Sequence, residues 1–305
     1  MTLFAEAAPA GPLRRVVLHL AYDGSGYRGF APQSSGRTVA GALAAALEKI
    51  TGAPIRVTCA GRTDAGVHAL AQVVHVDLPV AFLSGRFGAP GAPGEELPRL
   101  ARNLSGLLGP DCVVWRARLA PPGFDARRSA ESRRYRYEID AGAFQSPLRR
   151  HLAWHVEGPL DLAAMRLASD ALIGEHDFAG FCRQPPADGG GKSAGPIRRR
   201  VLEAGWHVAP VPRPPRFGEG PGEATVTLTF EIAAKAFCHQ MVRSIVGMLV
   251  AIGTGRARAS DLVGRLRSGS REGAPTLAPP TGLCLVEVGY PEELGGSVTF
   301  PAPAR

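Results

Sequence analysis

Arg62 and Asp64 stand two residues apart in a short loop that the sequence places between two strands. The stretch reads CAGRTDAGVHALAQVVHVD, residues 59–77, and Gly61 and Gly66 flank the two charged residues. Glycine on both sides lets the backbone approach a ligand closely. A single carboxylate with an arginine nearby is typical of an acid kept ionised, either to attack a substrate carbon or to remove a proton.

The same loop also has a purely structural interpretation. An arginine–carboxylate pair about 4 Å apart is worth about 4 kcal/mol at an effective dielectric of about 20, enough to hold Asp64 charged in a partly dry pocket. The DAG sequence, however, equally suits a turn in which the Asp64 carboxylate hydrogen-bonds to its own backbone. The loop alone therefore leaves both a catalytic acid and a structural turn open.

Two residues far along the chain could complete a site around this acid. Arg243 lies in a predicted helix over about 235–252, where it interrupts a lining of apolar residues that runs from Met241 to Leu249. A charge there is costly unless it meets a carboxylate such as Asp64, although it could also extend to solvent. Tyr135, in the strand-like stretch RYRYEID, could stack on a nucleobase or pack in the core beside Tyr137.

Metal and thiol chemistry are not predicted. His68 and His75 are seven residues apart on strand-like sequence with no ligand set nearby, which favours structural roles. The cysteines form no C-x-x-C pair, so neither a zinc site nor a disulfide framework is indicated, and buried free thiols are expected instead. They are Cys59, Cys112, Cys182, Cys238 and Cys284.

The stretch YDGSGYRGF contains a complete G-x-G-x-x-G, formed by Gly24, Gly26 and Gly29. A dinucleotide fingerprint should open a helix directly after a buried parallel strand and be followed by an acid that ends the next strand. Here Pro32 and QSSG intervene before any helix, and Glu48, the acid about 20 residues on, lies within a helix. We therefore do not expect a cofactor cradle.

Charge and composition favour a polyanionic partner. The 305-residue chain has a net charge of +8, and Lys49, Lys192 and Lys235 are its only lysines among 35 basic residues. Arginine binds phosphate with a planar fork of donors and can stack on bases. Genome composition could explain the arginine excess but not the positive sign. No apolar stretch is long enough to span a membrane, and the first residues do not resemble a signal peptide, so we expect a cytoplasmic protein.

The elements that must position these residues are readable from the hydrophobic pattern. Apolar residues alternate along 15–22, which predicts a half-buried strand, and Thr38 caps a helix that Gly52 ends. Strands over 55–59, 72–78 and 112–119 and a helix over about 97–108 complete a β-α-β-β-α-β order, that of a ferredoxin-like unit.

The second half repeats this theme less clearly. Strands are expected over 134–140, 151–157, 199–208, 223–234 and 282–290, and helices over 161–173, about 235–252 and 260–268. We expect an N-terminal half over 13–125 and a C-terminal half over 126–291. Residues 1–12 are expected to be disordered, 292–305 to form a tail, and the Pro/Gly-rich stretches 183–196 and 209–222 to be mobile.

Four motifs in order give the chain a family resemblance. These motifs, YDGSGYRGF, CAGRTDAGVHALAQVVH, FDARRSAESRRYRY and FCHQMVRSIVGML, resemble the tRNA pseudouridine synthase A family. The resemblance covers roughly Arg15 to Tyr290. That family isomerises uridines in the anticodon stem-loop of tRNA. One departure is GFAPQ, where the family usually has Gly-Trp-Gln-x-Gln.

The resemblance implies a role for each candidate residue. Asp64 matches the essential aspartate, Arg62 the arginine that orients the site, Tyr135 the tyrosine that contacts uracil, and Arg243 the arginine that pairs with the carboxylate. It also implies an α/β (α+β) fold of two ferredoxin-like, RRM-like halves, which form an extended, mostly antiparallel sheet with a central basic cleft.

Further implications concern partners and substrate. The resemblance predicts a homodimer with neither metal nor organic cofactor, a tRNA rather than a DNA partner, and modification at positions 38, 39 and 40. The arginine runs 127–128, 133–136 and 198–200 are candidate phosphate contacts. A non-catalytic RNA-binding or tRNA-folding module remains the alternative, against which the intact set of four residues argues.

Overall fold

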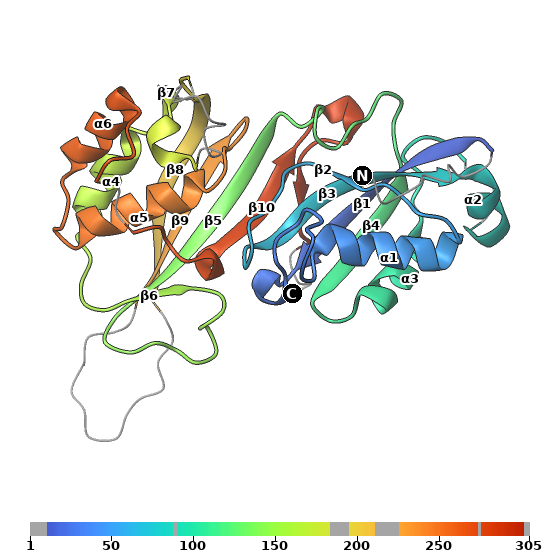
Figure 1. Cartoon of the computed structure of the whole chain (residues 1–305), viewed down its shortest axis with the longest axis horizontal. Helices are drawn as coiled ribbons and strands as arrows, with labels where there is room; N and C mark the ends of the chain where they lie inside the picture. The colour runs from blue at the N-terminus through green and yellow to red at the C-terminus, as the bar shows by residue number, and fades with distance from the viewer. Residues whose placement is uncertain (1–10, 88–90, 184–194, 211–225, 274–275, 302–305) are drawn as a thin grey trace. The chain divides into compact units, whose positions relative to one another are not determined.

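The computed structural model describes residues 11–87, 91–183, 195–210, 226–273 and 276–301 (Figure 1). The expected disordered start and most of the two Pro/Gly-rich stretches lie outside these ranges. The chain divides into two compact units, the first formed by residues 1–133 and 285–305 and the second by 134–284. None of the described helices is both long and apolar enough to cross a bilayer.

The first unit has the strand order of a ferredoxin-like fold. Hydrogen bonds join its strands in the order β4-β1-β3, and β2 pairs with β3, all antiparallel. Helices α1 and α3 lie on one face of this sheet (Figure 1). The elements are β1 (Leu13–Tyr22), α1 (Val39–Thr51), β2 (Thr58–Cys59), β3 (His68–Pro79), α2 (Val80–Phe87), α3 (Pro98–Leu108) and β4 (Cys112–Leu119).

Local sequence explains the helix boundaries that position the sheet. The Thr38 hydroxyl accepts from the Gly41 N–H, which caps α1, and Gly52 ends it with φ 75°. Both features match the expectation, since a threonine N-cap and a left-handed glycine are the standard ends of a helix. Leu43 and Leu47 then pack fully buried beneath the sheet.

β1 is buried on both faces rather than on one, which corrects the half-buried expectation. The residues after Tyr290 cover part of β4, the strand beside β1: the Leu294 carbonyl accepts a hydrogen bond from Arg118 Nη2 at 3.0 Å, and Phe300 packs edge-on against Trp115. This segment holds β11 (Val298–Thr299), which pairs with the end of β10 (Leu283–Gly289). The tail had no readable pattern, so the sequence did not predict this cover.

The second unit carries the strand order β5-β9-β8-β7, with β6 parallel to β5. Its β5-β9-β8 part, with α4 before β8 and α5 after β9, repeats the ferredoxin-like order, and helices cover one face of the sheet (Figure 1). The elements are β5 (Ser132–Ala141), β6 (Trp154–Val156), α4 (Leu162–Asp170), β7 (Gly174–Asp177), β8 (Arg198–Pro210), β9 (Val226–Ala234), α5 (Met241–Gly253) and α6 (Ala259–Ser268).

Four elements differ from those expected, and the cause is clear for one of them. α5 begins at Met241, six residues later than predicted, because the apolar pattern continues through an irregular segment that includes Gln240 at φ 64°. β2 is confined to Thr58–Cys59, and α2 and β7 were not expected. The mixed α/β, mostly antiparallel fold is confirmed.

The expectation of free thiols is wrong for two of the five cysteines. Cys182 and Cys238 form a disulfide, with 5.7 Å between their Cα atoms and a sequence separation of 56. Their distance in the chain and the absence of a C-x-x-C pattern hid this pairing. Cys59, Cys112 and Cys284 are free.

Candidate active site

The loop that carries Arg62 and Asp64 connects β2 to β3 in the first unit. Its entry is fixed by a hydrogen bond from the Ala60 N–H to the Val73 carbonyl oxygen at 2.8 Å. The turn that follows is closed by the Val67 N–H, which donates to the Asp64 carbonyl at 3.2 Å. Arg62 is exposed and Asp64 is half-buried, so both side chains are within reach of a ligand.

Buried polar side chains of β1 and β3 form hydrogen bonds with this loop. The Tyr22 and Thr63 hydroxyls are 2.8 Å apart. Gln72 Nε2 donates to the Gly61 carbonyl at 2.7 Å and to the Tyr22 hydroxyl at 3.3 Å. The loop is therefore tied to β1 and β3 by side chains as well as by the chain itself.

The G-x-G-x-x-G segment serves as the backbone support of this loop. Gly24–Gly26 form a single 3-10 turn, and the Phe30 N–H donates to the Thr63 carbonyl at 3.0 Å. Gly29 has φ 97°, and a Cβ there would lie 3.0 Å from the Thr63 oxygen and 3.2 Å from the Ala65 nitrogen. Glycine is needed here because two backbones meet, not because a phosphate binds.

Both histidines near the loop have structural contacts, as predicted. The Gly24 N–H donates to His68 Nδ1 at 3.1 Å, and the Asp23 carboxylate lies 3.1 Å from the same nitrogen. His75 Nδ1 accepts from the Ala126 N–H at 3.0 Å. Within the described residues, no three His, Cys, Asp or Glu side chains are grouped as metal ligands.

The thiol at the start of the loop is not a candidate nucleophile at neutral pH. Burial raises the pKa of Cys59 to about 11, although the nearby Arg62 guanidinium acts in the opposite direction. A thiol with such a pKa carries almost no thiolate at pH 7, and the thiolate is the reactive form. Asp64 remains the candidate for attack or proton abstraction on this loop.

Arg133 belongs to the interior rather than to a phosphate-binding surface. It is 8% exposed, and its guanidinium donates to the carbonyls of Ala60, Arg127 and Ala130 at 2.8 to 3.0 Å. This corrects its place among the candidate phosphate contacts, since its donors are already used. One of those bonds, to Ala60, supports the entry of the Arg62–Asp64 loop.

Tyr135 lies in the second unit, on the buried face of β5. It is 8% exposed, and the ring of Phe237 packs edge-on against it with 5.1 Å between the centroids. Buried residues alternate along this strand as Arg133, Tyr135, Tyr137 and Ile139. This position is consistent with both interpretations of Tyr135, core packing and contact with a nucleobase. The ring is packed, and it also borders the irregular segment before α5.

Arg243 is held in place rather than extended to solvent. It lies in the first turn of α5, half-buried, and its Nε donates to the Ala278 carbonyl at 2.8 Å. The Ala278 N–H donates back to the Arg243 carbonyl at 3.2 Å. Its charge also acts on the buried Tyr137 hydroxyl, where it opposes the rise in pKa that burial causes.

Gln240, just before this helix, was missed by sequence reasoning. It is the only non-glycine residue with a positive φ among the described residues, at 64°, and it is the N-cap of α5. Such strain gathers at functional sites and costs roughly 1–3 kcal/mol. No signal in the sequence could have indicated it, because glutamine is not a residue typical of this conformation.

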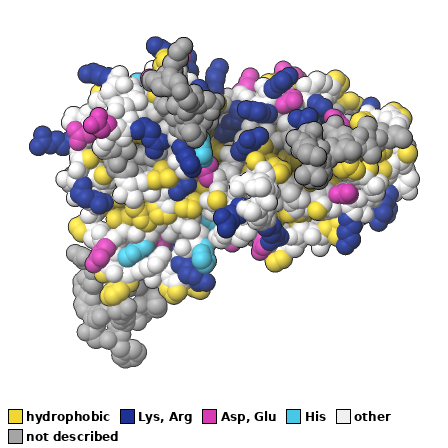
Figure 2. All heavy atoms as spheres, viewed as in Figure 1, with side chains coloured by type: hydrophobic (Ala, Val, Ile, Leu, Met, Phe, Trp, Pro, Cys, Tyr) yellow, Lys and Arg dark blue, Asp and Glu magenta, His cyan; other side chains and the backbone are white. Residues whose placement is uncertain are grey.

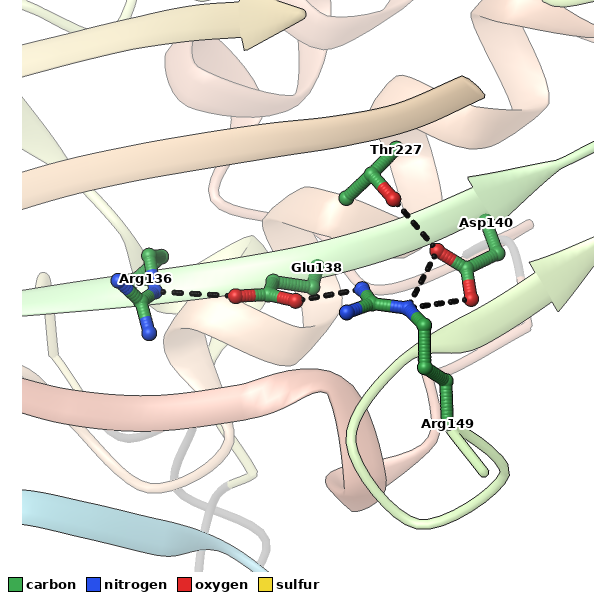
Figure 3. A network of polar contacts seen from close by, with 5 residues as sticks. All are labelled: Arg136, Glu138, Asp140, Arg149 and Thr227. Atoms are coloured by element: carbon green, nitrogen blue, oxygen red, sulfur yellow. Dashed lines mark hydrogen bonds and ion pairs between the residues drawn. The ribbon is translucent and has the colours of Figure 1, made fainter. Parts of the chain in front are cut away.

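Across the open face of β5, polar residues form a continuous network (Figure 3). Arg149 Nη2 donates to Glu138 at 2.6 Å and Arg149 Nε to Asp140 at 2.9 Å, while Arg136 lies 3.2 Å from Glu138. Thr227 of β9 donates to the buried Asp140 at 2.9 Å. Arg136, another candidate phosphate contact, is therefore already engaged with a carboxylate.

The remaining arginines of the basic runs differ from one another. Arg134 pairs with Glu203 at 2.8 Å. Arg198 and Arg200 are exposed at the start of β8, where Arg198 lies 3.7 Å from the Glu175 carboxylate. Exposed basic side chains lie on both units on the face drawn in Figure 2. Phosphate contact remains a prediction for the exposed members only.

Asp64 and Arg62 are thus brought together on one loop of the first unit, while Tyr135 and Arg243 lie in the second. A family model described as tRNA pseudouridine synthase matches residues 19–84 and 168–291, more than half of the chain. The chain belongs to the tRNA pseudouridine synthase family. It is accordingly an isomerase that acts on uridine in tRNA. The matched ranges include Arg62, Asp64 and Arg243, whereas Tyr135 lies between them.

Curated relatives agree with this assignment over most of their length. A protein described as tRNA pseudouridine synthase A from Streptomyces griseus subsp. griseus is 39% identical, with 92% of this chain and 89% of the relative covered. The protein of the same description from Frankia casuarinae is 42% identical over 92% and 91%. That from Methylococcus capsulatus is 39% identical over 92% and 91%.

Proposed function

We propose that this enzyme isomerises uridine to pseudouridine at positions 38, 39 and 40 in the anticodon stem-loop of tRNA, with Asp64 as the essential carboxylate. The observation that carries the proposal is the β2–β3 loop, which presents a half-buried acid beside an exposed arginine on a rigidly supported backbone. A loop made only to reverse the chain would not need buried side chains anchored at two points just before the acid, Gly61 and Thr63.

The reaction sets the requirements that this site must meet. The N1–C1′ glycosidic bond of uridine breaks, the uracil turns, and its C5 bonds to the same sugar carbon. The C5 hydrogen then leaves as a proton and N1 gains a proton, so atoms and electrons balance without an oxidant or a reductant. The base must leave the helical stack, which costs a few kcal/mol. Asp64 acts either as a nucleophile on carbon or as a base on a sugar proton.

The other three residues have complementary proposed roles. Arg62, exposed beside the acid, orients the tRNA backbone and helps displace the target nucleotide. Tyr135 contacts the freed uracil through its ring or hydroxyl. Arg243 pairs with the Asp64 carboxylate, and the hydrogen bond from its Nε to the Ala278 carbonyl holds the guanidinium in place for this contact.

The proposed compartment, oligomeric state and cofactor requirement follow from the family resemblance. We propose a cytoplasmic homodimer whose partner is tRNA, with no metal or organic cofactor in the reaction. The net charge of +8 supports binding to a polyanion, and exposed arginines such as Arg198 and Arg200 offer phosphate contacts.

The substrate positions can be tested with defined tRNA. The purified chain is incubated with a tRNA transcript that carries uridine at 38, 39 and 40, and with transcripts in which those uridines are replaced by cytidine. Pseudouridine is then mapped at single-nucleotide resolution. We expect modification at these positions and none in the substituted transcripts.

Two outcomes would contradict the proposal. Modification only at uridines outside the anticodon stem-loop would overturn the positions. Tight tRNA binding with no pseudouridine at any site would favour the alternative of an RNA-binding or tRNA-folding module.

A further inference from the structure

Thr63 separates Arg62 from Asp64 but faces a different environment. Its side chain is buried, with the residue 6% exposed, whereas Arg62 is exposed and Asp64 half-buried. Holding Thr63 inward therefore fixes the stretch of backbone from which both charged side chains project.

A chain of buried hydrogen bonds runs from Gln72 through the Tyr22 hydroxyl to Thr63. Gln72 Nε2 has two hydrogens, one donated to Gly61 O at 2.7 Å and one to the Tyr22 hydroxyl at 3.3 Å. The opposite amide orientation would place two acceptor oxygens against each other at Gly61, which excludes it. The Tyr22 hydroxyl thus accepts from Gln72, and it shares a hydrogen bond with the Thr63 hydroxyl 2.8 Å away.

Water cannot replace this chain. Gln72 is 0% exposed and Tyr22 is 5% exposed. Hydrogen bonds in such a dry site are strong, and a partner left without its bond carries the full cost of desolvation. The loop is therefore held in one conformation at two points, the Gly61 carbonyl and the Thr63 side chain.

We propose that Tyr22 and Gln72 are positioning residues for the reaction, acting through Thr63 and Gly61 on the placement of Asp64. The inference rests on the proposed role of Asp64. A displacement of about 1 Å in a reacting group can cost on the order of a hundredfold in rate. Loss of the Tyr22 hydroxyl should therefore slow the chemical step while leaving tRNA affinity unchanged.

The experiment compares variants that remove single hydroxyls. Tyr22→Phe and Thr63→Val each delete one end of the Tyr22–Thr63 contact, and Thr63→Ser restores the hydroxyl. Tyr290→Phe is the matched control, because Tyr290 is also 5% exposed and its hydroxyl donates to the Ala126 carbonyl at 2.7 Å in the same unit. Each protein is measured for tritium release from tRNA with [5-³H]uridine in a single turnover, for tRNA Kd, and for thermal melting.

We expect Tyr22→Phe and Thr63→Val to slow single-turnover release on the order of tenfold or more, with Kd within about twofold of wild type. The double variant should be little slower than either single one, since both remove the same contact. Thr63→Ser should recover most of the rate. Tyr290→Phe should melt about as much below wild type as Tyr22→Phe does, but keep the wild-type rate.

Wild-type rates in both Tyr22→Phe and Thr63→Val would overturn the positioning role. An equal slowing by Tyr290→Phe, or a failure of Thr63→Ser to recover the rate, would overturn it as well. Failure of the proposed function would give a different result, because the wild-type protein itself would then release no tritium. The positioning role would be overturned in that case too.

Discussion

His19 lies in β1 with 1% of its surface exposed. Neither of its ring nitrogens has a hydrogen-bond partner in the part of the chain that the structure describes, and the Trp115 ring packs edge-on at 4.9 Å. Burial lowers its pKa to about 3, and the charges of Arg118 and Arg116 add to this effect. The ring is therefore neutral in the folded protein at every pH at which the enzyme would work.

This burial makes the protein sensitive to mild acid. Between about pH 6.5, the ordinary histidine value, and pH 3, the unfolded chain binds a proton at His19 that the folded chain does not. Stability must therefore fall as the pH is lowered through that window. From pH 7 to pH 5 we expect His19 to contribute a loss of about 2 kcal/mol in the free energy of unfolding.

Denaturant unfolding at the two pH values measures this loss. His19→Phe should lose about 2 kcal/mol less than wild type, whereas His207→Gln, at an exposed position in β8, should lose as much as wild type. An identical loss in His19→Phe and wild type would show that His19 is not the acid-sensitive group.

The support of the β2–β3 loop depends on a neighbouring turn rather than on the strands alone. The backbone of Gly29 lies close to the backbone of Thr63 and Ala65, and the N–H of the next residue, Phe30, donates to the Thr63 carbonyl. Gly52, which ends α1, also has a positive φ, but a Cβ there would meet no atom within 4 Å. A comparison of the two glycines can therefore distinguish the effect of a strained backbone conformation from the effect of a contact with the loop.

Gly29→Ala and Gly52→Ala should therefore differ in their effect on activity. Both substitutions place alanine in a left-handed conformation, at a cost of roughly 1–2 kcal/mol in stability. Only Gly29→Ala should also displace the Arg62–Asp64 loop and slow single-turnover tritium release on the order of tenfold or more. Thermal melting and release assays on the two variants test this, and equal rates in both would contradict it.

Two compact units each repeat a ferredoxin-like order, and the four candidate site residues are divided between them. The hydrophobic alternation and caps predicted most elements, because periodicity and end residues such as Thr38 and Gly52 are local signals. The cover of β4 by residues after Tyr290 and the Cys182–Cys238 disulfide depend on contacts distant in sequence, and no local pattern predicts them.

The site was predictable to a similar degree. Motif spacing identified Arg62, Asp64, Tyr135 and Arg243 as candidates, and the structure adds what no spacing could supply: Tyr22, Gln72 and Gly29 as supports of the loop. The surroundings of the glycine motif argued against a cofactor cradle, and no sequence pattern indicated that its backbone supports the Arg62–Asp64 loop. The pairing of Asp64 with Arg243 stays a prediction.

The most direct test removes the negative charge of Asp64 and nothing else. Asp64→Asn keeps the size of the side chain, and Asp111→Asn, at a surface acid paired with Arg37 in the same unit, is the control. In a tritium-release assay with tRNA carrying [5-³H]uridine, we predict release by wild type and Asp111→Asn and none above background by Asp64→Asn, at equal tRNA binding. Wild-type release by Asp64→Asn would contradict the assignment of this carboxylate as the essential group.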